Sequence, residues 1–182
     1  MTLLPFDCKT LILSADANIQ PFFYPPKLLK KFFMSPEEFL QTVQNHSEKI
    51  ASAFERKIPL KVGNAGKSHF KENFRRGGFV NKNLTKWKPA KRIGRAKGAK
   101  GQYGTLLSAR NYLYNSINYR ALPYQVVIYT RVPYAIVHNE GLRAGRGKGF
   151  KMPKRQFIGD SAVLNNKISI IIDEELSKIL DL

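Results

Sequence analysis

Apolar residues recur at helical spacing in the segment that follows Ser35. Ser35 is the predicted N-cap, Pro36 takes the first helical position, and Glu38 completes a capping box. The face that follows at intervals of three and four comprises Phe39, Leu40, Val43, Ser47, Ile50, Phe54 and Ile58. This pattern predicts one amphipathic helix that ends before Pro59, because proline in a helix interior lacks the N–H donor.

Two further helices are predicted from similar signals. Residues 66–76 present Phe70 and Phe74 one turn apart and end at a Gly77-Gly78 left-handed cap, so this helix is expected to lie against the first. A last helix begins at Asp160 or Ser161, and its acids Asp173, Glu174 and Glu175 are predicted to face water. Its apolar stripe comprises Leu164, Ile168, Ile171, Ile172, Leu176, Ile179 and Leu180.

The strand signals are concentrated between these helices. Residues 125–131 are β-branched and aromatic, which predicts a strand, and this strand forms a hairpin with one through Ile117 and Tyr119. Short helices are expected in residues 105–115 and over residues 134–139, the latter ending at Gly141. The whole predicts an α+β fold: a small antiparallel sheet, a long N-terminal helix and a C-terminal helix packed on it, and long basic loops.

Length and composition set the organisation of the chain. With 182 residues we expect one domain over residues 35–182, preceded by an N-terminal extension over residues 1–34 that contains Pro21, Pro25 and Pro26. The apolar runs are far shorter than a membrane span, so no membrane association is expected. The lone Cys8 excludes an internal disulfide and a cysteine-based zinc site.

Positive charge is concentrated in the middle of the chain. Residues 56–155 contain 24 of the 31 Lys and Arg residues but only two of the 13 acids, Glu72 and Glu140. Half of these cations fall in two stretches predicted as loops, residues 79–104 and residues 142–151, the second of which is expected to be mobile. Such a basic block favours phosphates or an acidic protein surface as its partner, with salt-dependent association.

The motifs that could carry catalysis are incomplete. Gly66-Lys67-Ser68 lacks the earlier glycine of a phosphate-binding loop, because Lys61 occupies that position. His138 and Glu140 match half of a zinc deaminase signature, whose other half needs two cysteines. His46 and His69 lie on other segments, so a shared metal site is not expected and His138 is predicted to be a helix-end residue. No enzymatic activity is predicted.

Aromatic residues are interleaved with the basic segments: Trp87, Tyr103, Tyr112, Tyr114 and Tyr119. This arrangement is compatible with a nucleic-acid-binding domain without catalysis, which neutralises phosphates and stacks on bases. It is equally compatible with tyrosines that pack a sheet face while the loop lysines contact an acidic protein. Composition leaves both alternatives open; an enzyme acting on nucleic acid is a third, disfavoured because metal-dependent nucleases need acid clusters.

Several blocks occur in an informative order over residues 37–180. A phenylalanine-bearing helix ends at Arg75-Arg76-Gly77-Gly78, Trp87-Lys88-Pro89 follows, and Leu113, Ser116 and Ile117 fit a later block from which a Thr-Gly pair is missing. Then come Tyr134-Ala135-Ile136-Val137-His138-Asn139-Glu140-Gly141 and Met152-Pro153-Lys154-Arg155-Gln156-Phe157-Ile158-Gly159. In this order the blocks resemble the tail completion proteins of tailed phages, also called the virion morphogenesis family.

The resemblance implies a structural virion protein at the neck of the phage, synthesised in the host cytoplasm. It implies a homo-oligomeric ring, a hexamer, at the head-proximal end of the tail, with head-tail connector proteins, a tail tube or terminator protein and DNA in the channel as partners, and no cofactor or metal. The residues expected to contact these partners are Trp87, Lys88, Arg92, Arg95, Lys97, Lys100, Arg143, Arg146, Lys148, Lys151, Lys154 and Arg155.

Overall fold

The computed structural model describes residues 34–180. The chain divides into two units between Gln41 and Thr42, and the second unit contains the sheets, the last helix and both basic segments. The predicted N-terminal extension, apart from Met34, lies outside the described residues. Its boundary at residue 34 therefore stays a prediction.

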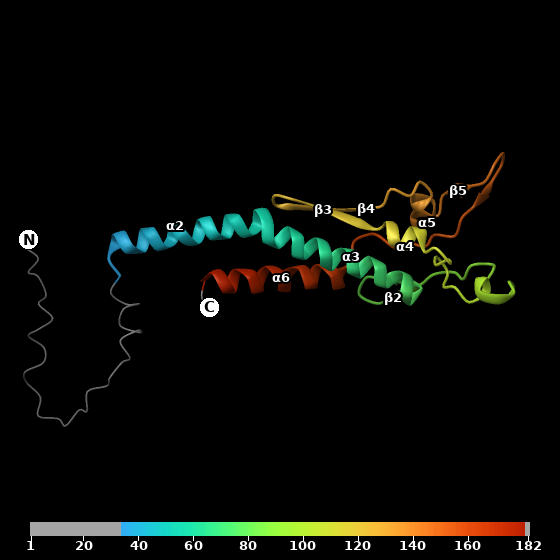
Figure 1. The fold of residues 1–182 in the computed structure, drawn as a ribbon, viewed down its shortest axis with the longest axis horizontal. Coiled ribbons are helices and arrows are strands. Elements are labelled where there is room, and N and C mark those ends of the chain that lie inside the picture. The colour runs from blue at the N-terminus through green and yellow to red at the C-terminus, as the bar shows by residue number, and fades with distance from the viewer. Residues whose placement is uncertain (1–33, 181–182) are drawn as a thin grey trace, which may run out of the picture. The chain divides into compact units, whose positions relative to one another are not determined.

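The element order confirms the predicted α+β class (Figure 1). Three separate two-stranded antiparallel sheets, β1–β2, β3–β4 and β5–β6, take the place of the single sheet that was expected. The helices are α2 (Pro36–Ser52), α3 (Ile58–Arg76), α4 (Tyr112–Ser116), α5 (Ala135–Glu140) and α6 (Ala162–Leu180). The strands are β1 (Gly78–Val80), β2 (Leu84–Lys86), β3 (Asn118–Leu122), β4 (Gln125–Tyr129), β5 (Arg143–Ala144) and β6 (Phe150–Lys151).

The first helix begins as predicted but does not end at Pro59. The Ser35 amide donates to Glu38 Oε2 (3.1 Å) and the Glu38 amide donates to Ser35 Oγ (3.2 Å), which is a complete capping box. Helix α2 then continues through a π-helical turn over Ala53–Lys57 directly into α3. Pro59 occupies the first turn after this wider turn, where a missing N–H donor costs little.

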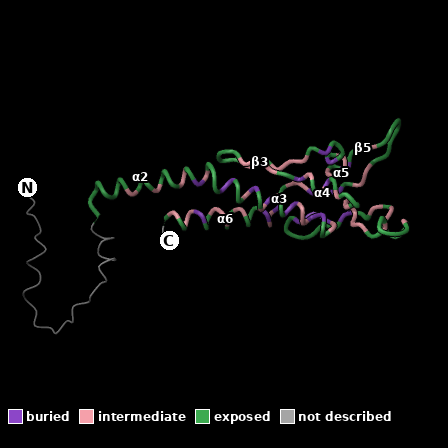
Figure 2. Tube along the Cα trace, in the orientation of Figure 1, coloured by how far each residue is buried: buried purple, intermediate pink, exposed green. Residues whose placement is uncertain are grey.

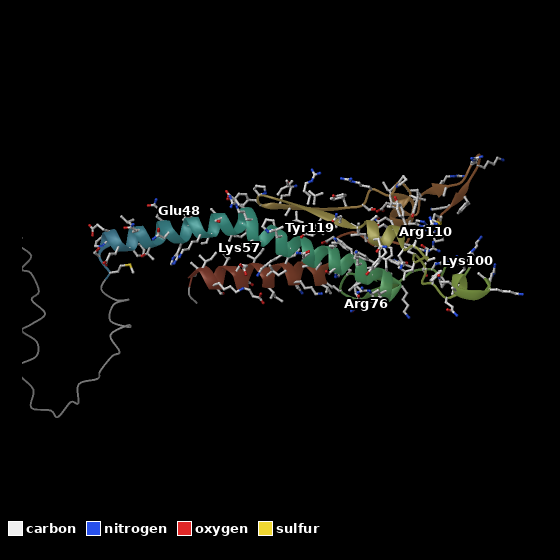
Figure 3. The ribbon with its side chains drawn as sticks, in the orientation of Figure 1. Glu48, Lys57, Arg76, Lys100, Arg110 and Tyr119 are labelled. Carbon is white, nitrogen blue, oxygen red and sulfur yellow. The ribbon has the colours of Figure 1, made fainter. Side chains whose placement is uncertain are left out.

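The two helices predicted as separate are therefore one continuous helical stretch, and its glycines serve packing. A Cβ at Gly63 would lie 2.1 Å from Tyr119 Cδ2, and one at Gly66 would lie 2.3 Å from Ile128 Cδ1. Glycine lets the β3–β4 hairpin approach the α3 backbone closely. Tyr119 and Ile128 face each other in the hairpin register, and Figure 3 shows Tyr119 beside α3. Gly77 ends α3 in the left-handed conformation (φ 64°), as predicted.

The core is an aromatic cluster around Phe74, which is 1% exposed. Its ring centroid lies 5.7 Å from that of Trp87, 5.9 Å from that of Tyr114 and 5.1 Å from that of Phe157. Ile117, also fully buried, belongs to the same cluster. Figure 2 shows buried residues gathered along α3 and beside α4, while α2 and the β5–β6 hairpin are mostly exposed.

Ser161 confirms the predicted start of the last helix. Its Oγ accepts a hydrogen bond from the Leu164 amide (3.3 Å), which caps α6, and donates one to the Val80 carbonyl (2.7 Å), which ties α6 to β1. The prediction that Glu175 faces water is wrong. Glu175 is 7% exposed and its Oε1 accepts from Lys61 Nζ on α3 (2.6 Å) and from Lys178 Nζ (2.8 Å).

We predict that Gly63→Ala destabilises the fold. On an exposed helix the change would add up to about 1 kcal/mol of stability, but here the methyl group collides with the Tyr119 ring. We expect the free energy of unfolding to fall by about 1 to 3 kcal/mol in urea denaturation. Asn64→Ala, at an exposed position of the same helix, is the control and should change little. A Gly63→Ala variant more stable than the wild type would refute the close approach.

The Lys61–Glu175–Lys178 cluster gives a pH prediction. Hydrogen bonds from Lys178 and Lys61 lower the pKa of Glu175 from 4.5 to about 2. Because the folded pKa lies below the unfolded one, this stabilisation is present above pH 4.5 and is lost as pH falls toward 2. Glu175→Gln should therefore flatten the acid limb of the stability profile, whereas the exposed control Glu174→Gln should retain it. Equal profiles for the two variants would contradict the assignment.

Candidate functional site

The two halves of the Tyr134-to-Gly159 segment are bound to each other. Asn139 Oδ1 at the end of α5 accepts hydrogen bonds from the amides of Phe157 (2.9 Å) and Ile158 (3.0 Å). The His138 carbonyl accepts from the Arg155 amide (2.7 Å). Gly141 ends α5 at φ 70°, as predicted, and a Cβ there would lie 2.9 Å from the Lys154 backbone nitrogen. The motif therefore closes a loop at its base.

The chain between these halves, residues 142–151, forms an arm. It was predicted as a loop, but Arg143 pairs with Lys151 and Ala144 with Phe150 across β5 and β6. Three glycines with positive φ, at positions 145, 147 and 149, allow the chain to reverse its direction, because other residues disfavour this backbone conformation. Arg143 donates from its guanidinium to the Lys148 carbonyl. The cations of the arm, Arg143, Arg146, Lys148 and Lys151, are all exposed.

The second basic segment, residues 88–104, is the basic loop. The part of the predicted loop before it is a hairpin, β1–β2, and only residues after Trp87 are irregular apart from a 3-10 turn over Gly98–Gly101. Lys88, Arg95, Lys97 and Lys100 are exposed. Figure 3 shows Lys100 at the outer end of the loop, away from the helices.

Three of the predicted contact residues are buried or half-buried and form hydrogen bonds within the chain. Trp87 is 7% exposed and its Nε1 donates to the Gln156 carbonyl (2.8 Å). Arg92 donates to the carbonyls of Gly104 (2.7 Å) and Leu107 (2.5 Å), so it shapes the loop from inside. Arg155 is 6% exposed. Sequence alone did not separate these side chains from their exposed neighbours.

Arg155 joins the bases of the two basic segments. Its Nε donates to the Lys88 carbonyl (3.0 Å) and its Nη2 to the Pro89 carbonyl (3.4 Å). Burial and the charge of Arg92 lower the pKa of the Arg155 guanidinium from its usual value. Arg155 adjoins Lys154, whose Nζ pairs with Glu140 (3.4 Å). The loop and the arm thus leave the core side by side. This proximity could not be predicted from the sequence, because more than fifty residues separate the start of the loop from the start of the arm.

His138 lies at this junction, and its Nδ1 has no hydrogen-bond partner among the described residues. This nitrogen is buried, and burial together with Arg155 lowers the pKa of the imidazole. The Tyr134 ring packs against it edge-on at 5.9 Å between centroids. No group of three or more His, Cys, Asp or Glu side chains in residues 34–180 is arranged to hold a metal ion.

No helix in the described part of the chain combines the length and the apolar composition that a bilayer crossing requires.

The α+β core thus projects two exposed basic segments from one anchored junction. The chain belongs to the phage virion morphogenesis family, whose model matches residues 40–177. This match confirms the family indicated by the sequence blocks. Neither the curated proteins nor the solved structures include a match to the chain.

We predict that Asn139→Ala loosens this junction. The substitution leaves the Phe157 and Ile158 amides without an acceptor, which should lower the free energy of unfolding by about 2 kcal/mol or more. Hydrogen exchange at these two amides should accelerate. Asn139→Asp retains an oxygen at the same position and should preserve most of the protection. Slow exchange in the alanine variant would show that another group holds the segment.

Proposed function

We propose that this chain is a structural virion protein that forms a homo-oligomeric ring at the head-proximal end of a phage tail. In this role it completes the tail and joins it to the head, and it has no catalytic role. Membership of the virion morphogenesis family supports a structural role in the particle. The observation that carries the proposal is the pair of exposed basic segments anchored side by side through Arg155.

The apolar face of α2 supports assembly with other subunits. No residue of this 17-residue helix is buried. Phe39, Leu40 and Val43 are 58%, 67% and 49% exposed. An amphipathic helix whose apolar stripe is left exposed by the described part of the chain offers a surface for another protein chain. In the proposed ring, neighbouring subunits cover this stripe, and a hexamer is the expected assembly.

The basic segments supply the electrostatic part of the proposal. Exposed cations that carry few ion pairs attract acidic surfaces over roughly one Debye length, about 8 Å at physiological salt. We propose that they contact the neighbouring subunit, the head-tail connector, and the tail tube or terminator protein. DNA in the channel is a further acidic partner of the same surface.

We predict that neutralising the arm blocks joining without unfolding the protein. A variant with Gln at Arg143, Arg146, Lys148 and Lys151 should fold normally, because these side chains are exposed. Head-tail joining should fall about tenfold or more, since several charge contacts are lost together. Infectious titre and electron microscopy counts of free heads and tails, in a phage complemented with the variant, give the measurement.

The matched control removes four exposed cations elsewhere, with Gln at Lys57, Lys82, Lys86 and Arg120. This variant should join heads and tails normally. A normal titre from the arm variant would refute the proposed role of the arm. A virus that lacks the whole gene and still yields joined particles would refute the proposed function itself.

A further inference from the structure

We propose that the arm of one copy docks on the outward face of α6 of the next copy, in a head-to-tail ring. The α6 face consists of Ile170, Asp173, Glu174 and Ser177, which lie at helical spacing on one side. The inference rests on the proposed homo-oligomer and names the surfaces that form it. Its occupant is a second copy of this chain, and the reasons lie in the charge and the exposure of both surfaces.

The positive charge of the arm is not balanced within the β5–β6 hairpin. Arg143 and Lys151 lie directly opposite each other in the β5–β6 register, so two like charges face each other across a ladder of only two residue pairs. Like charges in this position destabilise a hairpin, and a two-stranded hairpin alone is marginal in water. Phe150, which precedes Lys151 on β6 and lies opposite Ala144, is 55% exposed. The arm therefore presents an apolar side chain among cations, and none of these cations has an ion pair with an acid of residues 34–180.

The α6 face has the complementary composition. Ile170 is 55% exposed, although it belongs to a helix whose other isoleucines are partly covered. Together with Asp173, Glu174, Ser177 and Lys178 it lines a shallow depression of about 440 Å³. The ammonium of Lys178 is held by Glu175 at 2.8 Å. An apolar residue flanked by two carboxylates is thus open to a partner that carries an apolar residue flanked by cations.

Asp173 and Glu174 are two neighbouring exposed acids that the fold leaves available. Glu37 and Glu55 are also exposed and unpaired, but neither has a second unpaired acid beside it in the described part of the chain. Glu72, Glu140 and Glu175 are each bound to Lys or Arg, and Asp160 accepts from Asn165. Within residues 34–180, Asp173 and Glu174 form the one pair of adjacent acids in which neither carboxylate has a hydrogen bond or an ion pair. A basic arm that meets another copy of this chain finds its acidic counterpart here.

The arm of one copy does not reach the α6 face of the same copy. Within the unit of residues 42–182, the described end of α6 and the β5–β6 hairpin lie at opposite ends (Figure 1). The contact must therefore join two copies through different surfaces, which is a heterologous interface. Interfaces of this type close into rings when the rotation between copies closes. The basic loop is then left for the connector, the tube or DNA.

Charge reversal on both surfaces tests the inference in the purified full-length protein. The arm variant carries Arg143→Glu and Lys151→Glu, the face variant carries Asp173→Lys and Glu174→Lys, and a combined variant carries all four. Sedimentation velocity measures assembly against the monomer mass of 20.7 kDa. Each double variant should need about tenfold or more protein to assemble, and the combined variant should assemble like the wild type.

Mixing the two double variants supplies an independent readout. Each then meets its complement in the other, so the mixture should assemble where neither does alone, in alternating rings that close only with an even number of copies. The control for the arm reverses two cations of the basic loop, Lys97→Glu and Lys100→Glu, and should assemble normally. Circular dichroism establishes that every variant is folded.

The outcomes separate the inference from the proposed function. Wild-type assembly that neither double variant weakens, or weakening that the combined variant does not reverse, would overturn the inference and leave the ring intact. A wild type that stays monomeric alone and on purified tails would overturn the ring and the inference together. An arm variant that assembles normally but loses binding to a short DNA duplex would assign the arm to DNA and also overturn the inference.

Discussion

The buried amide of Asn73 is the constraint on which the rest of the structure depends. Asn73 is 0% exposed; its Nδ2 donates to the Phe157 carbonyl (3.1 Å) and its Oδ1 accepts from the Val80 amide (3.2 Å). One side chain on α3 thereby fixes β1 and the chain entering α6. Beside it, Phe74 packs against Phe157 and Trp87. A buried amide left without these partners would cost about 1 to 3 kcal/mol for each lost bond, so the arrangement is strongly specified.

This anchored core explains how long basic segments can project from a small protein. Phe157 is fixed by Asn73 on one side and by Asn139 on the other, and Arg155, two residues earlier, binds the start of the basic loop. The basic loop and the arm, which lie outside these anchors, bury little surface, and their like charges repel each other. Their cations therefore remain available to a partner, at the cost of self-repulsion that the core must offset.

The sequence predicted local elements well where one signal acted alone. The capping box at Ser35, the Gly77 and Gly141 caps, the β3–β4 hairpin and the start of α6 were all confirmed. Pro59 was misjudged because a π-helical turn accommodates the proline inside a continuous helical stretch. The close approach of the hairpin to Gly63 could not be predicted, because it depends on tertiary context. The roles of Arg155 and Glu175 could not be predicted, since charge alone does not tell which cation or carboxylate is buried by distant segments.

In the proposed function, an anchored core presents its exposed surfaces to neighbouring copies in the neck of a phage particle. The most direct test is cryo-electron microscopy of tails and whole particles from the phage or prophage that encodes this chain. We expect a closed ring of this protein at the head-proximal end of the tail, with each β5–β6 arm on the α6 helix of the adjacent copy. Particles in which the protein is absent, or occupies another position as isolated subunits, would contradict it.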